Sequence, residues 1–300
     1  MIEHIPAAAI LLKVKDGSAW FGTDYNLNLY RGCCHGCIYC DSRSSCYRID
    51  DFDKVRAKKD ALQILERELR SKRTTGVVGM GSMSDTYNPF EKQLLLTRGA
   101  LSLLQRYGFG VSIETKSALI TRDADLLSEI AAKSDVIAKI TITTADDSLT
   151  KKLEPYVSSS AERFTALKTL SGKGIFAGVL LSPLLPFIND TEENVRSIVR
   201  RAADCGARFV NMYMPGVTLR DNQREHYYEK LDQLFPGLSA RYRALFGEQY
   251  SCSSPNAKRL VYTLKNTCER YGLLYKMGDI ISGYKKKSKA PEQMSLFEPL

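Results

Sequence analysis

Three cysteines close together near the start of the chain give the clearest chemical signal. They lie in the string NLYRGCCHGCIYCDSRS at 27–43, where Cys33, Cys37 and Cys40 have the spacing C-x3-C-x2-C. Three thiolates can cover one face of a metal centre, but a structural zinc site needs four ligands and usually takes them from two cysteine pairs. A [4Fe–4S] cubane has four irons that each need an outer ligand, so three cysteines would leave one iron open. The spacing therefore favours an iron–sulfur cluster with a free coordination site.

Two other interpretations of these cysteines stay open. A zinc ion could use the three thiolates with a distant fourth ligand, or the thiols could bind no metal. Cys34 is adjacent to Cys33 and points elsewhere, so we do not count it as a ligand. The remaining cysteines are isolated from one another: Cys46, Cys205, Cys252 and Cys268.

The elements that would position these thiols alternate along the chain between short β-rich runs and amphipathic segments. Six such alternations imply an α/β fold with a parallel sheet, because each parallel pair requires a helical crossover. In folds of this kind the site lies at the carboxyl ends of the strands. The expected strands are 25–30, 76–80, 109–114, 136–143, 175–181 and 208–213, and the expected helices between them are 55–72, 91–107, 122–132, 160–172 and 191–204.

After about residue 215 the alternation stops, and three helical patterns follow at 223–234, 238–246 and 256–271, ahead of a short extended stretch. We therefore expect four parts. They are an N-terminal lead-in at 1–19, a core domain at 20–220, a helical C-terminal extension at 221–284 and a flexible basic tail at 285–300.

Polar residues end several of the expected strands. The string GMGSMSD at 79–85 contains small residues that let a backbone approach a ligand, and Asp85 could accept a hydrogen bond from an ammonium group. A simple turn before the next helix is the alternative. Lys116 follows a buried strand, where an ammonium is costly unless it meets an anion, either a ligand or a neighbouring carboxylate. Thr141 and Thr143 share one face of their strand, although threonine is also a good strand former.

The cysteine spacing and its context resemble the radical S-adenosylmethionine (SAM) superfamily. Tyr39, just before the third cysteine, also fits that pattern. The strings YRGCCHGCIYC, GSMSDTYNPFE, ETKSALITRD, TITTADDSLTKKLEP and LLSPLLPFIND resemble its spore photoproduct lyase-like branch, also called the DNA repair photolyase-like family, over about residues 20–220. This resemblance implies a partial (β/α)6 barrel that binds a [4Fe–4S] cluster and SAM.

The resemblance also implies roles for single residues. The amino and carboxylate groups of SAM would chelate the open iron, and Lys116 would meet the SAM carboxylate. Gly81, Ser84 and Asp85 are the nearest equivalents of a Gly-Gly-Glu-like motif that this chain lacks. Thr141 and Thr143 stand where the superfamily binds ribose hydroxyls.

The chemistry implied by the family is reductive cleavage of SAM to a 5′-deoxyadenosyl radical, which takes hydrogen from a substrate carbon. One known substrate of the family is a thymine dimer in spore DNA. A second hydrogen donor, often Cys or Tyr, is then needed, and the candidates here are Cys46 and Tyr213. The electron would come from a donor such as flavodoxin or ferredoxin. The alternatives are modification of RNA or protein, and an iron–sulfur redox sensor without turnover.

Charge points to a polyanionic partner. The chain carries a formal net charge of +9, and residues 53–73 hold eight Lys or Arg against four Asp or Glu. DNA is the expected partner, and a solvated helix face is the alternative. In the tail, Gln293, Met294, Ser295, Leu296 and Phe297 resemble the pentapeptide with which bacterial repair proteins bind the DNA sliding clamp. The tail could instead fold back onto its own domain.

The sequence offers no candidate for a membrane span or a secretory signal. The longest apolar stretch, at 178–188, contains Pro183 and Pro186 and is far shorter than the roughly 20 residues that a spanning helix needs. The N-terminus has no basic region ahead of its apolar run. We therefore expect a cytoplasmic protein whose thiols stay reduced.

Overall fold

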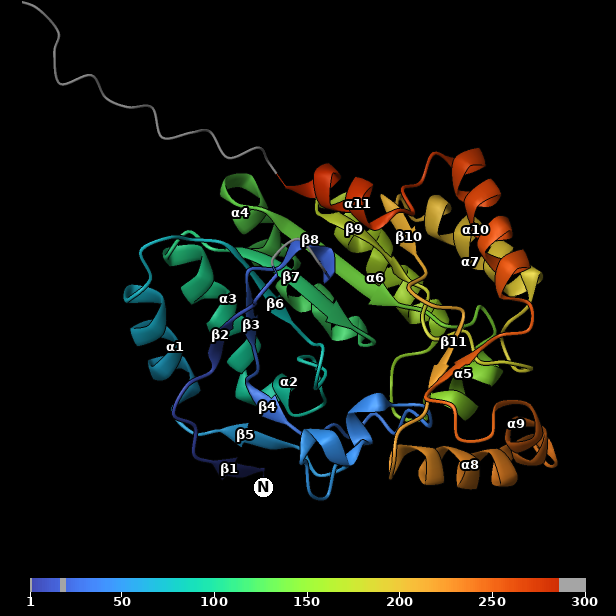
Figure 1. Ribbon diagram of the computed structural model, residues 1–300. Helices are drawn as coiled ribbons and strands as arrows, with labels where there is room; N and C mark the ends of the chain where they lie inside the picture. Colours follow the sequence, from blue (N-terminus) through green and yellow to red (C-terminus); the bar gives the residue numbers. More distant parts are fainter. Residues whose placement is uncertain (1, 17–19, 286–300) are drawn as a thin grey trace, which may run out of the picture.

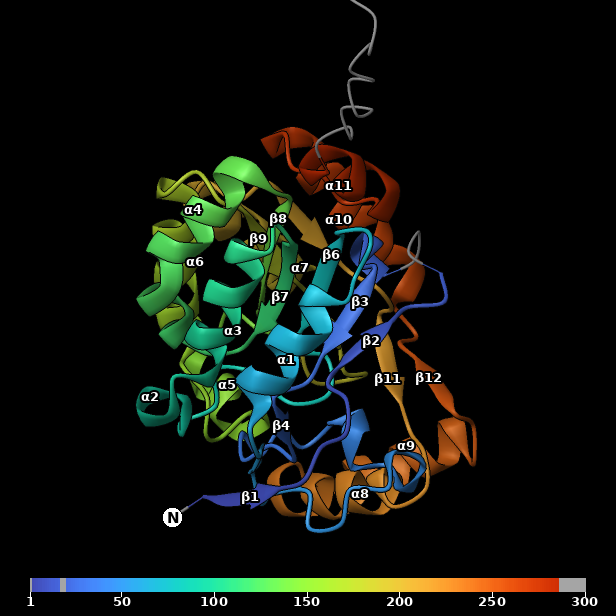
Figure 2. The same ribbon diagram turned by 90° about the vertical axis from the view of Figure 1, so that its left-hand side faces the viewer.

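The structure is a computed structural model that describes residues 2–16 and 20–285. The predicted clamp-binding motif at 293–297 lies outside the described residues. The chain forms a curved, mostly parallel sheet with helices over its outer face, as Figures 1 and 2 show. In the described part of the chain, no helix combines the length and the apolar character needed to cross a membrane.

The central sheet has seven strands in the order β10-β9-β8-β7-β6-β3-β2. All neighbours pair in parallel except β2, which runs antiparallel to β3 at the edge. The six predicted parallel strands are thus confirmed; five are somewhat shorter than predicted, and β7 is shifted by one residue. The strands are β2 (Leu11–Lys13), β3 (Tyr25–Leu27), β6 (Val77–Met80), β7 (Gly110–Thr115), β8 (Val136–Thr141), β9 (Phe176–Leu180) and β10 (Phe209–Asn211).

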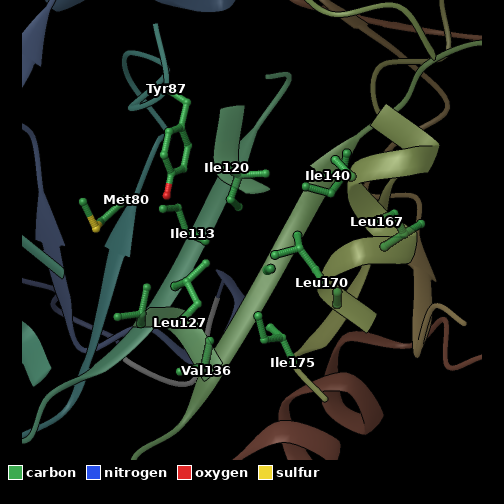
Figure 3. Close-up of a cluster of buried hydrophobic side chains, with 14 of the residues drawn as sticks. Met80, Tyr87, Ile113, Ile120, Leu127, Val136, Ile140, Leu167, Leu170 and Ile175 are labelled. Carbon is green, nitrogen blue, oxygen red and sulfur yellow. The ribbon is translucent and has the colours of Figure 1, made fainter. Parts of the chain in front are cut away.

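Helices cover the outer face of this sheet because alternate strand residues are apolar and point outward. Figure 3 shows part of the resulting core, where Ile113 of β7 and Ile140 of β8 pack with helix residues such as Leu127 and Leu167. The covering helices are α1 (Ala61–Arg70), α3 (Leu96–Arg106), α4 (Ala124–Lys133), α6 (Ser160–Gly172) and α7 (Glu192–Asp204).

Two predicted helices differ from the structure. The basic segment at 55–72 begins with strand β5 (Arg56–Lys58), so α1 starts only at Ala61. The predicted helix at 91–107 is divided by Leu95, whose φ of 53° lies in the left-handed region, into α2 (Glu91–Leu94) and α3. The short helix α5 (Asp147–Leu153) was not predicted, and the stretch after residue 271, which was expected to be extended, contains the further helix α11 (Met277–Tyr284).

Two smaller sheets lie beside the main one. Strands β1 (Glu3–Ile5), β5 and β4 (Tyr30–Arg31) form a three-stranded sheet, in which β4 precedes and β5 follows the cysteine loop. In the C-terminal part, β11 (Gly216–Thr218) pairs with β12 (Ser251–Ser253), which the sequence did not indicate. The three predicted C-terminal helices are present as α8 (Gln223–Leu234), α9 (Leu238–Phe246) and α10 (Ala257–Tyr271).

The curved central sheet forms a half-barrel, and its inner face is closed at the amino ends of the strands. A 3-10 turn at Trp20–Gly22 and the last helix, α11 (Met277–Tyr284), pack there against Val77, Ile137 and Phe209. The Tyr284 hydroxyl donates a 2.6 Å hydrogen bond to the Phe21 carbonyl. These residues form an apolar plug at the amino ends of the strands. The carboxyl ends are therefore the open end of the half-barrel.

Candidate active site at the carboxyl ends of the strands

The three predicted cluster ligands line one small cavity of about 100 Å³. They lie on the loop after β4, which is fixed by backbone hydrogen bonds from Cys33 N to Phe52 O and from Ile38 N to Leu153 O. Gly32 allows this close packing, because a Cβ atom there would lie 2.4 Å from the carbonyl oxygen of Lys54. The loop therefore holds its thiols in place through contacts with two distant parts of the chain.

The donor set fits an iron–sulfur cluster. Burial raises the pKa of all three thiols, that of Cys33 to about 12, so a bound metal is required to hold them as thiolates. Within the described ranges, no three His, Cys, Asp or Glu side chains converge tightly enough for a single ion. A cubane binds each thiolate at a different iron, so its ligands surround the cluster instead of meeting at one point.

The predicted glycine-rich loop borders the same cavity. Gly81 has a φ of +101°, and a Cβ atom there would lie 2.0 Å from the Glu114 carbonyl oxygen, so only glycine lets the loop cross the end of β7. The Ser84 hydroxyl donates a 2.5 Å hydrogen bond to the Gly32 carbonyl. The loop is thereby tied to the cysteine loop.

Asp85 joins the cysteine loop to β7. Its carboxylate accepts hydrogen bonds from Thr115 Oγ1 at 2.7 Å and Lys116 N at 2.8 Å, and it lies 3.5 Å from Nδ1 of His35. Asp85 also lines the cavity. The carboxylate is therefore engaged by the protein itself while it faces the space that a ligand would fill.

Lys116 brings a positive charge to the cavity. Two carboxylates that line the same cavity are engaged elsewhere, since Glu114 pairs with Lys139 and Asp85 contacts His35. The Lys116 ammonium lies 5.8 Å from the centre of the Tyr39 ring. Burial opposes its charge, but the surrounding ionisable groups, Cys37 first among them, raise the pKa of Lys116 above its ordinary value. Lys116 is therefore a cation that lines the small cavity and could attract an anionic group of a ligand.

A buried ion pair that the sequence analysis did not identify supports this cavity. Glu154 and Arg163 are fully buried, with Arg163 Nη2 and Glu154 Oε2 2.5 Å apart. The Tyr39 hydroxyl donates a hydrogen bond to Glu154, and Arg163 Nη1 donates a 3.0 Å hydrogen bond to the Thr141 carbonyl. Burial opposes the charge of Glu154, but Arg163 and Lys116 lower its pKa. The pair connects the cysteine loop to β8.

The two predicted threonines have different positions. Thr141, the last residue of β8, lines the cysteine cavity and the larger cavity next to it. The Thr143 hydroxyl donates a 3.3 Å hydrogen bond to Glu154 and is almost fully buried. The structure therefore places Thr141 on the ligand-facing surface and Thr143 in the supporting network.

The larger cavity, of about 410 Å³, opens from the smaller one. The two share six lining residues, which are Cys40, Ser42, Ser82, Glu114, Lys116 and Thr141. The additional lining includes four aromatic residues from segments far apart in the sequence: Trp20, Tyr39, Tyr213 and Tyr250.

The two predicted hydrogen donors lie in different surroundings. Tyr213 lines the larger cavity, is 70% exposed and contacts Trp20 edge to face at 5.2 Å between ring centroids. Cys46 is exposed on a neighbouring turn and is not part of either lining. Its sulfur accepts a 2.9 Å hydrogen bond from Arg220, which in turn donates to the Tyr250 hydroxyl. Of the two, only Tyr213 reaches the cavity.

Comparison with known proteins agrees with this geometry. Residues 27–202 match the family described as the radical SAM superfamily. An uncharacterized protein of Mycobacterium tuberculosis is 30% identical over 231 residues, which cover 74% of this chain and 67% of that protein. An uncharacterized protein of Methanocaldococcus jannaschii is 35% identical over 173 residues, which cover 57% and 64% of the two chains.

Solved structures share the fold at low sequence identity. A mutant spore photoproduct lyase with bound AdoMet (SAM) and dinucleoside spore photoproduct superposes with a TM-score of 0.65 and 15% identity, over 91% of this chain and 80% of that one. The radical SAM methyltransferase TsrM from Kitasatospora setae, with cobalamin and a [4Fe–4S] cluster, gives a TM-score of 0.52 and 12% identity, over 81% and 52% of the chains. Three thiols at the open end of a six-stranded half-barrel, together with the family match, lead to one conclusion: the chain belongs to the radical SAM superfamily, and its cofactors are a [4Fe–4S] cluster and SAM.

Proposed function

We propose that this protein is a radical SAM enzyme of lyase type that acts on damaged DNA. The observation that carries the proposal is the continuity of the two cavities, because a cofactor bound among the cysteines then faces an aromatic space large enough for a second ligand. When bound, the cluster and SAM together supply a 5′-deoxyadenosyl radical that abstracts hydrogen from a substrate carbon.

The smaller cavity would hold the cluster and the methionine end of SAM. Cys33, Cys37 and Cys40 bind the cluster in this proposal, and Lys116 binds the SAM carboxylate. Burial of this cavity excludes water and strengthens the attraction between the ammonium and the carboxylate. Around them, the proposed SAM-binding residues are Tyr39, Gly81, Ser84, Asp85 and Thr141, while Thr143 would support the site through its hydrogen bond to Glu154.

The final hydrogen atom would come from Tyr213. This side chain lines the larger cavity, where a substrate would lie, and its hydroxyl can donate a hydrogen atom to a product radical. Cys46 remains the second candidate, although its sulfur lies outside that lining and would need a rearrangement of the turn and Arg220.

Two observations support DNA as the substrate. The similar structures include spore photoproduct lyase complexed with dinucleoside spore photoproduct, with a TM-score of 0.65. The basic segment also offers exposed positive charges. Lys54 and Arg56 are paired with Glu3, but Lys59, Arg67 and Arg73 form no ion pair among the described residues. These three are suited to backbone phosphates.

Further partners follow from the same proposal. The electron would come from flavodoxin or ferredoxin in the cytoplasm. Residues 293–297 would bind the sliding clamp and so bring the enzyme to replicating DNA.

Deuterium transfer tests the proposal. Reduced, reconstituted protein is given SAM and DNA containing deuterated spore photoproduct, and 5′-deoxyadenosine is analysed by mass spectrometry. Deuterium in 5′-deoxyadenosine is the expected result. SAM cleavage without deuterium transfer from this DNA would contradict the lesion as substrate and favour RNA or protein, while complete absence of SAM cleavage would favour a redox sensor.

A further inference from the structure

Glu114 is a charged residue at the junction of the two cavities to which the proposed function assigns no role. It is the fifth residue of β7, lines both cavities and has a side chain that is 15% exposed. Its register partner on β8 is Lys139, whose side chain is 2% exposed. The inner face of the half-barrel thus carries one ion pair directly above its apolar plug.

The protein occupies one oxygen of this carboxylate. Glu114 Oε2 lies 3.2 Å from Lys139 Nζ and accepts a 3.4 Å hydrogen bond from Trp20 Nε1. The other oxygen, Oε1, accepts no hydrogen bond from any described residue. This atom is also not fully buried. Since the side chain lines both cavities, Oε1 is the acceptor that a ligand can reach.

Burying the Glu114–Lys139 ion pair at this position costs desolvation free energy. Burial lowers the pKa of Lys139, and Glu114 opposes that change. A buried ion pair is often no more stable than an apolar pair of similar size. Lys139 and Trp20 do, however, hold the Glu114 carboxylate in a fixed orientation, and an apolar pair would provide no hydrogen-bond acceptor here.

The surroundings of Glu114 show which kind of ligand would meet it. Trp20 holds the carboxylate and contacts Tyr213 edge to face, and both rings line the larger cavity but not the smaller one. A flat ring packed against these aromatic side chains would present its edge to Glu114. A carboxylate accepts hydrogen bonds only, so that edge must carry a donor.

We propose that Glu114 determines substrate specificity by accepting a hydrogen bond from a ring N–H group of a nucleobase in the larger cavity. The favoured edge is the imide of a pyrimidine, whose N–H lies between two carbonyl groups. The inference rests on the proposed action on nucleic acid and names the residue that reads the base. Glu114 is a recognition residue in this proposal and does not take part in the radical step.

The test compares two probes that differ at the imide nitrogen. Holoprotein with SAM is titrated with dinucleoside spore photoproduct and with its analogue methylated at the ring imide nitrogens. The wild type should bind the methylated probe about tenfold more weakly or worse, because a hydrogen bond to a charged group is lost. In Glu114→Gln the discrimination should fall to a few-fold, since a neutral acceptor is weaker.

A second variant separates recognition from folding. Glu114→Leu combined with Lys139→Met removes both charges and leaves neither unpaired. This variant should bind both probes alike and retain wild-type SAM affinity. Ser112→Ala, on the same strand but away from both cavities, is the matched control and should discriminate like the wild type.

Three outcomes would overturn the inference. The first is equal affinity of the wild type for both probes, and the second is discrimination that survives in the double variant. The third is a loss of SAM affinity in the Glu114 variants with unchanged discrimination, which would assign the carboxylate to the cofactor. If the wild type binds neither probe, the DNA-lesion proposal fails by itself. Oligouridine and its 3-methyluridine counterpart then replace the probes, and equal or absent binding of these would overturn the role of Glu114 as well.

Discussion

The two connected cavities are built in different ways. The smaller one is enclosed by the cysteine loop and by the ends of β6, β7 and β8, and its polar groups are held by hydrogen bonds to one another. The larger one is lined by aromatic residues from far apart in the chain, and Tyr213 and Tyr250 are strongly exposed. The first arrangement suits cofactors that all members of a superfamily share, and the second suits a substrate that differs between members.

The strongest test of this division removes a cluster ligand from the smaller cavity. We expect Cys37→Ala to lose the brown absorbance, the bound iron and sulfide, and all SAM cleavage. Cys34→Ala is the matched control, because this neighbouring thiol does not line the cavity and should be dispensable. A Cys37→Ala protein that keeps its iron and sulfide would refute the proposed ligand set.

The second largest effect is expected from the buried ion pair between Glu154 and Arg163, which supports the smaller cavity and should stabilise the folded state. Glu154→Gln leaves the Arg163 guanidinium buried without its carboxylate, so the free energy of unfolding should fall by about 3–5 kcal/mol. Urea denaturation of the reconstituted protein measures this change. Lys54→Gln, which breaks an exposed pair with Glu3, should cost less than about 1 kcal/mol. Equal losses in both variants would show that the buried pair has no special structural role.

Lys116 tests whether the smaller cavity binds the SAM carboxylate. We expect Lys116→Met to weaken SAM binding by about ten- to a hundredfold, because a charged hydrogen bond is worth about 1.5–3 kcal/mol. The cluster spectrum should remain. Equilibrium dialysis with labelled SAM gives the dissociation constant, and Lys59→Met serves as an exposed control. An unchanged SAM affinity would remove Lys116 from the proposed site.

Tyr213 tests the larger cavity without disturbing the smaller one. Tyr213→Phe keeps the ring and removes the hydroxyl, so SAM cleavage should stay within about twofold of wild type. Repaired product should decrease, with abortive products in its place. Cys46→Ser, compared in the same chromatographic assay, should have little effect. The reverse pattern would make Cys46 the hydrogen donor.

Much of the fold could be predicted because buried parallel strands are continuous apolar runs, and all six begin within a residue of the predicted position. The left-handed Leu95 that divides a helix was not predictable, since leucine rarely takes that conformation. Residues 56–58 were assigned to a helix because their strand character depends on pairing with β1 and β4.

The candidate site was predictable where the chemistry is local in sequence. The three cysteines and Lys116 could be identified from their spacing and strand context, and the structure brings them together. Glu154 and Arg163 were missed because each acquires its role only through a partner on another element. Trp20 and Tyr250 were missed for a related reason, because more than two hundred residues separate them and no local pattern links them.

The position of α11 has a consequence for how the protein could be anchored. This helix closes the amino ends of the strands. Lys285, just after it, has its Nζ 3.7 Å from Oδ2 of Asp24, which precedes β3 at the same end. Lys285, the last described residue, therefore lies at the end of the barrel opposite the cysteine loop. A partner that bound the described surface of α11 would therefore leave the open end of the barrel free for a second molecule.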